Sequence, residues 1–286
     1  MKLARHGGGP PAVARAYWSQ VHPVFMLPPL AVALFGALLA GSVAPGTASL
    51  HLVAIFAAVY TAHVKDGLVD FHVRGEDDDH PLTVAGCRVG LVGSTATFVG
   101  ACLGLFVLVD WIAVALTVPT WLIASLHAPQ LDTNPVTATT GYPAGIVLAL
   151  LGGYYVQAGE VAPIVLGFGV VFLALLSGIK VVDDAQDLEY DRSIEKRTVA
   201  VVLGPVGAHR LAYGLMAAAL LAVAGLAVAG LFPPTSVLAI AAFAVVAAIA
   251  WRAEAELATM LLVRGSYVFL AVLVAAVWFD PLAGIG

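Results

Sequence analysis

The chain of 286 residues is 61% hydrophobic and only 11% charged, whereas an average soluble domain is about 25% charged. This composition leaves too much apolar surface for a water-soluble fold, and it excludes intrinsic disorder, a fibrous repeat and a nucleic-acid-binding module. The formal net charge of −5 is modest, so the positions of the charges carry more information than their sum. We therefore expect an all-α, polytopic membrane protein.

Nine stretches are long and apolar enough to cross a bilayer as helices, which takes about 17–25 residues each. The fourth, fifth and eighth are short or polar at one end, so a count of eight is the alternative. We expect one domain over residues 1–286, with Asp-rich segments at about 65–85 and 180–205. In chain order the nine predicted spans are 23–41, 49–64, 86–109, 111–126, 142–158, 161–182, 206–231, 235–250 and 257–279.

The basic residues orient these spans, because Lys and Arg remain on the cytoplasmic side of a membrane. With nine spans and a cytoplasmic N-terminus, all 13 Lys and Arg residues fall in cytoplasmic segments or at cytoplasmic span ends. The turns on the other face, at 42–46, 158–160 and 232–234, contain no basic residue. We therefore expect a multi-pass protein of the cell membrane whose N-terminus and Asp-rich segments are cytoplasmic.

Two short windows contain 12 of the 18 acidic residues, and each follows an even-numbered span. Solvated loops of an organism living in high salt would also be acidic, and this remains an alternative for the run at 76–79. The first window holds Asp66, Asp70, Glu76, Asp77, Asp78 and Asp79, and the second holds Asp183, Asp184, Asp187, Glu189, Asp191 and Glu195.

The spacing of these carboxylates indicates a metal site. Asp66 and Asp70 are four residues apart, and Asp184, Asp187 and Asp191 follow an i, i+3, i+7 pattern, so each set lines one face if its helix continues. Like charges at this spacing repel, whereas a divalent cation would attract them. Mg²⁺ uses oxygen ligands from one or two carboxylates together with substrate phosphates.

Basic residues are interleaved with the second acidic window. Cations beside Mg²⁺-binding carboxylates are typical of a diphosphate site, because they pair with phosphate oxygens. The residues concerned are Lys180, Arg192, Lys196 and Arg197.

The segment 180–204, KVVDDAQDLEYDRSIEKRTVAVVLG, closely resembles the second aspartate-rich motif of the UbiA superfamily of intramembrane prenyltransferases. That motif reads D-x-x-D-x-x-x-D and is followed by K-R-T. The family has nine transmembrane helices with its motifs after the second and sixth, which are the positions of the two acidic windows. The matching residues are Asp184, Asp187, Asp191, Lys196, Arg197 and Thr198.

The first motif departs from the family pattern N-D-x-x-D-x-x-x-D. Asp66 stands where Asn is usual, Gly67 replaces the next Asp, Asp70 is kept, and Arg74 replaces the last Asp. The loop expected at 127–141 contains no basic residue, although many family members hold diphosphate there. Diphosphate would then be held by Arg74 or by the basic residues of the second window.

The resemblance implies an Mg²⁺-dependent enzyme whose catalytic, metal-binding residues are the five motif aspartates. Its substrates would be an allylic prenyl diphosphate and a lipophilic or aromatic acceptor, met among membrane lipids, with neither nucleic acid nor an obligate protein partner. Segments 153–159 and 70–77 are similar to the menaquinone-type branch, which prenylates 1,4-dihydroxy-2-naphthoate. Ether-lipid, carotenoid and other quinone acceptors remain open.

Two other interpretations of the polar residues remain. A cation transporter or channel would also use intramembrane carboxylates, although it needs them near the bilayer midplane rather than at one edge. His63, His72 and His80 flank the first acidic window and would serve as Zn²⁺ ligands, as a general base or as solvated loop residues.

Overall fold

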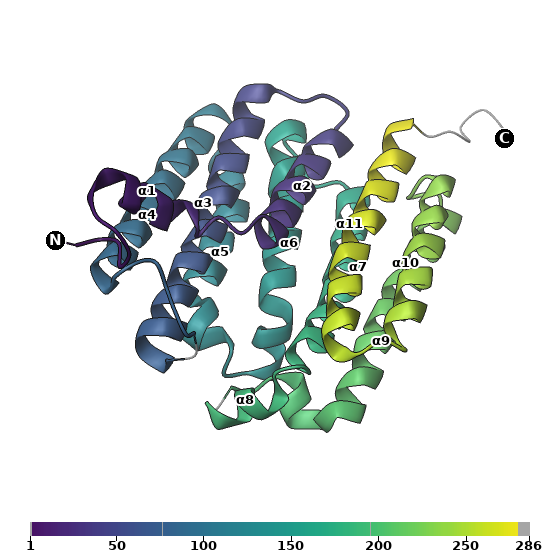
Figure 1. Ribbon diagram of the computed structural model, residues 1–286. Coiled ribbons are helices and arrows are strands. Elements are labelled where there is room, and N and C mark those ends of the chain that lie inside the picture. The colour runs from purple at the N-terminus through teal and green to yellow at the C-terminus, as the bar shows by residue number, and fades with distance from the viewer. Residues whose placement is uncertain (1, 76, 195, 280–286) are drawn as a thin grey trace. The chain divides into compact units, whose positions relative to one another are not determined.

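The computed structural model describes residues 2–75, 77–194 and 196–279. Within these ranges the chain is helical and has no β-strand, only an isolated bridge between Ala4 and Leu82. A helix lies at each of the nine predicted spans (Figure 1). The α-helices are α1 (Gly9–Trp18), α2 (Pro23–Leu39), α3 (Pro45–Val69), α4 (Val84–Leu108), α5 (Trp111–Leu126), α6 (Pro135–Ala158), α7 (Pro163–Asp184), α8 (Leu188–Ser193), α9 (Val199–Val228), α10 (Val237–Ala250) and α11 (Ala255–Phe279).

The predicted all-helical membrane architecture is confirmed, whereas the count of nine spans stays a prediction. Among the described residues, seven helices are long and apolar enough to cross a bilayer: α3 with its continuation to Arg74, α4, α5 with its continuation to Leu131, α6, α7, α9 and α11. Helices α1 and α2 reach this length only as a pair, and the chain bends by 62° between them. The segment Pro234–Ala250, which contains α10, is a shorter apolar helix.

Two helix starts differ from the sequence prediction. Helix α6 begins at Pro135 and continues through Pro143, because Asn134 accepts a hydrogen bond from the Val136 amide and a proline suits the first helical position. A π-helix, η2 (His127–Leu131), occupies the preceding residues, so most of the loop expected at 127–141 is helical. Helix α9 begins at Val199, and its ladder is broken where Gly204 has φ +71°.

The chain forms two compact units, and α6 contributes one half to each. Residues 1–132 and 148–159 form the first unit, in which α3 packs against α2, α4 and α5 (Figure 1). Small residues allow close helix contacts there. A Cβ at Gly36 of α2 would overlap the Leu150 carbonyl oxygen of α6, and one at Gly153 would overlap that of Ala33.

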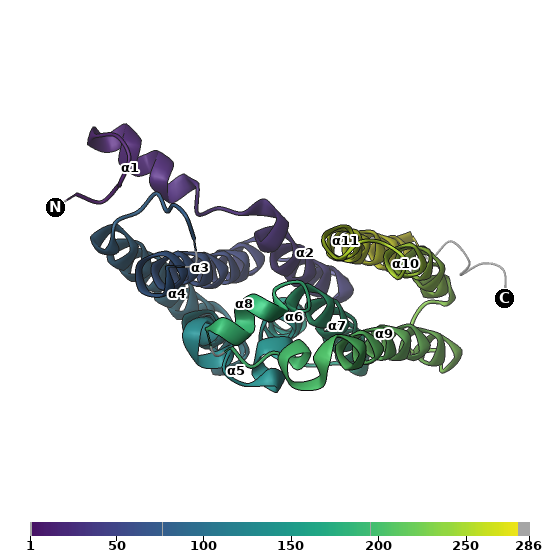
Figure 2. The same cartoon turned by 60° about the horizontal axis from the view of Figure 1, so that its bottom comes forward.

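Residues 133–147 and 160–286 form the second unit. Helix α7 packs along α9, and α10 packs along α11 (Figure 2). Aromatic side chains fill the core, with the rings of Phe168 and Phe232 stacked at 3.9 Å and the ring of Phe269 edge-on to Phe172 and Phe243. These buried apolar contacts hold α7, in whose last turn the second acidic window begins.

Each acidic window lies between the end of one long helix and a threonine-capped start of the next. Thr83 accepts a hydrogen bond from the Gly86 amide at the start of α4, and Thr198 accepts one from the Val201 amide at the start of α9. Such caps satisfy amides that have no partner within the helix. Each acidic window therefore ends before the threonine that caps the next helix.

Candidate active site

The two carboxylates of the first motif lie one helical turn apart. Asp66 is in the last turn of α3, and Asp70 begins a π-helical turn, η1 (Asp70–Arg74), that continues α3 without a break. The helix therefore continues as the spacing requires, and both side chains lie on one face. The turn ends at Gly75, whose φ of +67° favours glycine.

Arg74 connects this motif to a distant part of the first unit. Its guanidinium lies 3.4 Å from Oδ1 of Asp70 and 2.7 Å from Oδ2 of Asp132, which follows η2. Sequence reasoning did not assign a role to Asp132, because its contact to Arg74 spans 58 positions. The one indication in the sequence was that Asp132 lies in the loop where many family members have a basic residue.

The space beside Gly67 explains why the first motif lacks a carboxylate at this position. A Cβ at Gly67 would overlap the imidazole of His80, which is buried. His80 Nε2 lies 3.6 Å from the Cys87 sulfur, and His72 Nε2 lies 3.0 Å from the Leu82 carbonyl oxygen. These contacts engage His72 and His80 as structural residues, which argues against the zinc interpretation.

The N-terminal segment runs along the end of the first acidic window. Arg5 and His6 both bond to Asp79, at 2.7 Å and 2.9 Å, and the Arg5 guanidinium lies 4.2 Å from the centre of the Phe71 ring. The hydrogen bond from His6 holds the pKa of Asp79 below its usual range, and Arg5 acts in the same direction. Asp79 is therefore a tether for the N-terminal segment.

In the second motif, Lys180 of α7 lies between two carboxylates. Its Nζ is 2.9 Å from Asp183 and 2.6 Å from Asp184, and the Asp184 side chain is only 8% exposed. Helix α7 ends at Asp184, so the helix does not continue through the motif as one face would need. A turn over residues 185–187 instead separates the end of α7 from α8.

Asp187 precedes the short helix α8, and Asp191 lies within it. Asp187 is the exposed N-cap residue, whereas Asp191 is buried and lies 3.6 Å from Lys196 Nζ. Burial raises the pKa of Asp191, Lys196 lowers it, and neighbouring Asp187 raises it further. The motif therefore concentrates carboxylates whose mutual repulsion a cation would relieve.

The remaining predicted residues lie at the surface or outside the described ranges. Arg192 is exposed and pairs with Glu189 at 2.9 Å, and Arg197 is exposed. The structure therefore does not place Arg192 against the motif carboxylates. Glu76 and Glu195 of the two acidic windows lie outside the described residues.

The donor chemistry of the two motifs fits Mg²⁺. In the described part of the chain, no group of three or more His, Cys, Asp or Glu residues is positioned to hold a metal by itself. Mg²⁺ does not need such a group, because it takes one or two carboxylates and adds water and substrate phosphates. The Oδ2 atom of Asp184 is buried without a hydrogen-bond partner, and burying such an oxygen is unfavourable unless a cation or donor meets it.

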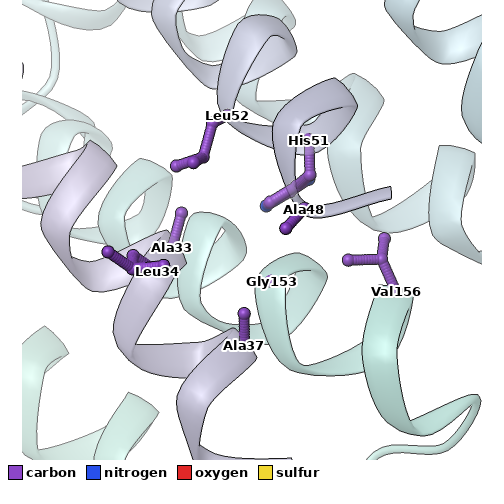
Figure 3. Close-up of a pocket in the computed structure, with 8 residues that line it drawn as sticks. All are labelled: Ala33, Leu34, Ala37, Ala48, His51, Leu52, Gly153 and Val156. Carbon is purple, nitrogen blue, oxygen red and sulfur yellow. The ribbon is translucent and has the colours of Figure 1, made fainter. Parts of the chain in front are cut away.

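A pocket elsewhere in the first unit is not part of this site. It leaves no room for a water molecule, whereas ligand sites usually enclose about 300–1,000 Å³. It lies beside His51, some 15 residues and about 22 Å along α3 from Asp66. Figure 3 shows the residues that line it, which are small or apolar apart from one imidazole: Ala33, Leu34, Ala37, Ala48, His51, Leu52, Gly153 and Val156.

Solved membrane proteins share this architecture, although no family model and no curated protein matches the sequence. The apo structure of a UbiA homologue from Aeropyrum pernix K1 aligns with a TM-score of 0.71 at 18% identity, covering 88% of this chain and 98% of the homologue. A digeranylgeranylglyceryl phosphate synthase aligns at 0.70 and 14% identity, covering 93% and 98%. A UbiA homologue from Archaeoglobus fulgidus, bound to GPP and Mg²⁺, aligns at 0.67 and 16%, covering 92% and 99%. The chain therefore has the UbiA fold.

Proposed function

We propose that this chain, which has the UbiA fold, is an integral membrane prenyltransferase. It would transfer a polyprenyl group from an allylic prenyl diphosphate to a quinone precursor or a lipid. The observation that carries the proposal is the second motif, where buried Asp184 and Asp191 lie against Lys180 and Lys196 at the end of α7. Charges of both signs at a membrane edge are costly to bury, and an Mg²⁺–diphosphate complex would pair with both.

The motif carboxylates and the basic residues would divide the work. Bound Mg²⁺ would supply Lewis-acid stabilisation of the diphosphate as the carbon–oxygen bond breaks. The Lys and Arg side chains would donate to the phosphate oxygens and hold the leaving group, while the apolar helices exclude the water that would hydrolyse an allylic carbocation. The metal-holding residues would be Asp66, Asp70, Asp184, Asp187 and Asp191, and the diphosphate-holding residues Lys180, Arg74, Arg192, Lys196 and Arg197.

Two chemical classes of acceptor have support. Structural likeness to a digeranylgeranylglyceryl phosphate synthase supports a glyceryl lipid hydroxyl. The sequence GYYVQAG at 153–159 supports an aromatic quinone precursor instead. Both classes place a nucleophilic oxygen or carbon next to the allylic carbon, so the same donor assay serves for both.

The test is consumption of geranylgeranyl diphosphate by membranes that contain the full chain. We expect turnover with Mg²⁺ and none after chelation, and mass spectrometry of the product identifies the acceptor class. Asp187→Ala and Asp191→Ala should each abolish turnover. Glu189→Gln is the matched control on the same helix, since exposed Glu189 pairs only with Arg192 among the contacts described here, and it should keep turnover.

Two results would overturn the proposal. If geranylgeranyl diphosphate is not consumed in an Mg²⁺-dependent way with either acceptor class, the chain is not a prenyltransferase. Full activity of Asp191→Ala would show that Asp191 does not hold the metal. The rival class, a cation transporter, predicts Mg²⁺ entry into liposomes containing the protein. We expect no such entry, because the motif carboxylates lie at the ends of α3 and α7 rather than midway along them.

A further inference from the structure

An ion pair outside both acidic windows ties Asp132 to the first motif. The Arg74 and Asp132 side chains are only 14% and 15% exposed, and their closest atoms are 2.7 Å apart. The second carboxylate oxygen of Asp132, Oδ1, is buried without a hydrogen-bond partner. A half-buried ion pair of this length restricts the guanidinium to one side of the motif.

Two carboxylates lie near the Arg74 guanidinium, at different distances. Asp70, one turn earlier on the same helix, is 3.4 Å from the guanidinium, whereas Asp132 is 2.7 Å from it. An arginine four residues from a single carboxylate would close on it and form a two-pronged pair. Such a pair would compete with Mg²⁺ for Asp70, because both cations need the same oxygens.

We propose that Asp132 is a positioning residue, which holds Arg74 back from Asp70 so that Asp70 binds the metal and Arg74 serves the diphosphate. This proposal rests on the proposed function. The two carboxylates that attract the Arg74 guanidinium belong to different segments, since Asp70 follows α3 and Asp132 follows η2. Asp132 thereby does for the first motif what Asp183 and Asp184 do for Lys180 in the second, where one cation is shared by two carboxylates.

The experiment separates the metal requirement from diphosphate affinity, using the full-length protein in detergent. The probe is Mg²⁺ titrated in the presence of geranyl thiolodiphosphate, an unreactive donor analogue, with thermal unfolding as the readout. Asp132→Asn should raise the half-saturating Mg²⁺ concentration by about tenfold or more, the size typical of residues that orient metal ligands. Asp132→Glu should restore it, because a carboxylate again holds Arg74.

The double variant Arg74→Gln/Asp132→Asn distinguishes positioning from a merely structural tie. Without the competing guanidinium, its half-saturating Mg²⁺ concentration should equal that of the wild type, whereas its affinity for the analogue should fall as in Arg74→Gln. In this variant neither position 74 nor position 132 carries a charge, so neither member of that pair is left buried alone, and the variant serves even where Asp132→Asn does not fold. An unchanged Mg²⁺ requirement in Asp132→Asn, or a raised one in the double variant, would overturn the inference alone. Failure of the wild type to bind Mg²⁺ and analogue would overturn the proposed function with it.

Discussion

Gly67 and His80 illustrate how one packing contact reshapes a motif. The resemblance leads us to expect a carboxylate at position 67, but the His80 ring fills the space that its side chain would need. His80 is buried beside Phe71 and His72, with ring centres 6.1 Å and 5.8 Å away. The glycine therefore follows from the neighbouring loop, which the motif pattern alone does not describe.

Gly67→Ala should destabilise the protein by about 1–3 kcal/mol, the usual effect of overpacking a well-filled site. The new methyl group would displace the His80 ring, so Gly67→Ala/His80→Ala should recover part of the loss. Thermal unfolding in detergent measures both changes. Gly93→Ala is the matched control, because nothing lies within 4 Å of a Cβ at this position of α4, and a drop in its stability as large as that of Gly67→Ala would contradict the packing argument.

Lys180→Met should destabilise the second unit more strongly than removal of an exposed pair. The change would leave Asp184 buried without its cation, and breaking a buried pair by removing one partner costs about 3–5 kcal/mol. Lys180→Met/Asp184→Asn should therefore be more stable than Lys180→Met alone, as measured by denaturation. Arg192→Met, which breaks the exposed pair with Glu189, serves as the comparison, and we expect a change below about 1 kcal/mol. Equal losses for the two single variants would contradict this account.

Residue spacing in the sequence agrees with part of the local geometry, whereas the roles of these residues stay predictions. Asp66 and Asp70 lie on one continuous helix face as their spacing indicates, and Lys180 and Lys196 contact motif carboxylates. The partner of Arg74 could not be predicted, because Asp132 contacts it only after two helices have folded between them. Local periodicity contains no information on such contacts.

At the scale of elements, hydropathy locates helices better than it locates their ends. All nine predicted spans coincide with helices, since a run of apolar side chains indicates a membrane helix directly. The start of α6 was wrong because residues 135–141 are polar enough to resemble a loop, whereas Asn134 and Pro135 cap them as a helix. The end of α7 at Asp184 could not be predicted either. The i, i+3, i+7 spacing of the acidic residues is compatible with a continuous helix and also with a turn between two helices.

The loop that precedes α4 should make stability depend on pH. Burial lowers the pKa of His80, and His72 and Arg5 act in the same direction, whereas Asp77 and Asp79 oppose it. His80 therefore binds a proton less readily in the folded protein than in the unfolded chain. The free energy of unfolding should fall as the pH decreases through about 6.5, the pKa of an unperturbed histidine.

Thermal unfolding between pH 8 and pH 5 measures this dependence. His80→Gln should reduce the slope between pH 7 and pH 5.5, because one buried titrating group is gone. A second loss belongs to Asp79, whose pKa is lowered by His6, and appears only as the pH falls through about 3.9. A slope in His80→Gln equal to that of the wild type would contradict the contribution of His80.

At the scale of the whole molecule, the two acidic windows occupy equivalent positions along the chain. Each begins at the end of a helix long enough to cross the membrane, and each ends at a threonine that caps the next helix, Thr83 or Thr198. Four membrane-length helices, α4 to α7, lie between the windows along the chain. If all four cross, this even number of crossings returns the chain to the side it left, so we expect both windows on one side, and the positive-inside rule predicts that this side is the cytoplasm.

Cysteine labelling with an impermeant maleimide tests this topology. The variants Asp78→Cys and Ile194→Cys should react from the same side, and Ala44→Cys from the other, since only α3 separates position 44 from position 78. The native Cys87 and Cys102 are buried and are replaced by alanine to remove background. Labelling of positions 78 and 194 from opposite sides would refute the arrangement.

The same reagent decides between nine spans and fewer. Position 253 follows α10, and α9 and α10 separate it from position 194. If the shorter helix α10 crosses the membrane, two crossings place Ala253→Cys on the side of Ile194→Cys. If α10 does not cross, only α9 intervenes and the label reacts from the other side. We expect the first result, because Arg252 lies at the end of α10 and basic residues remain cytoplasmic.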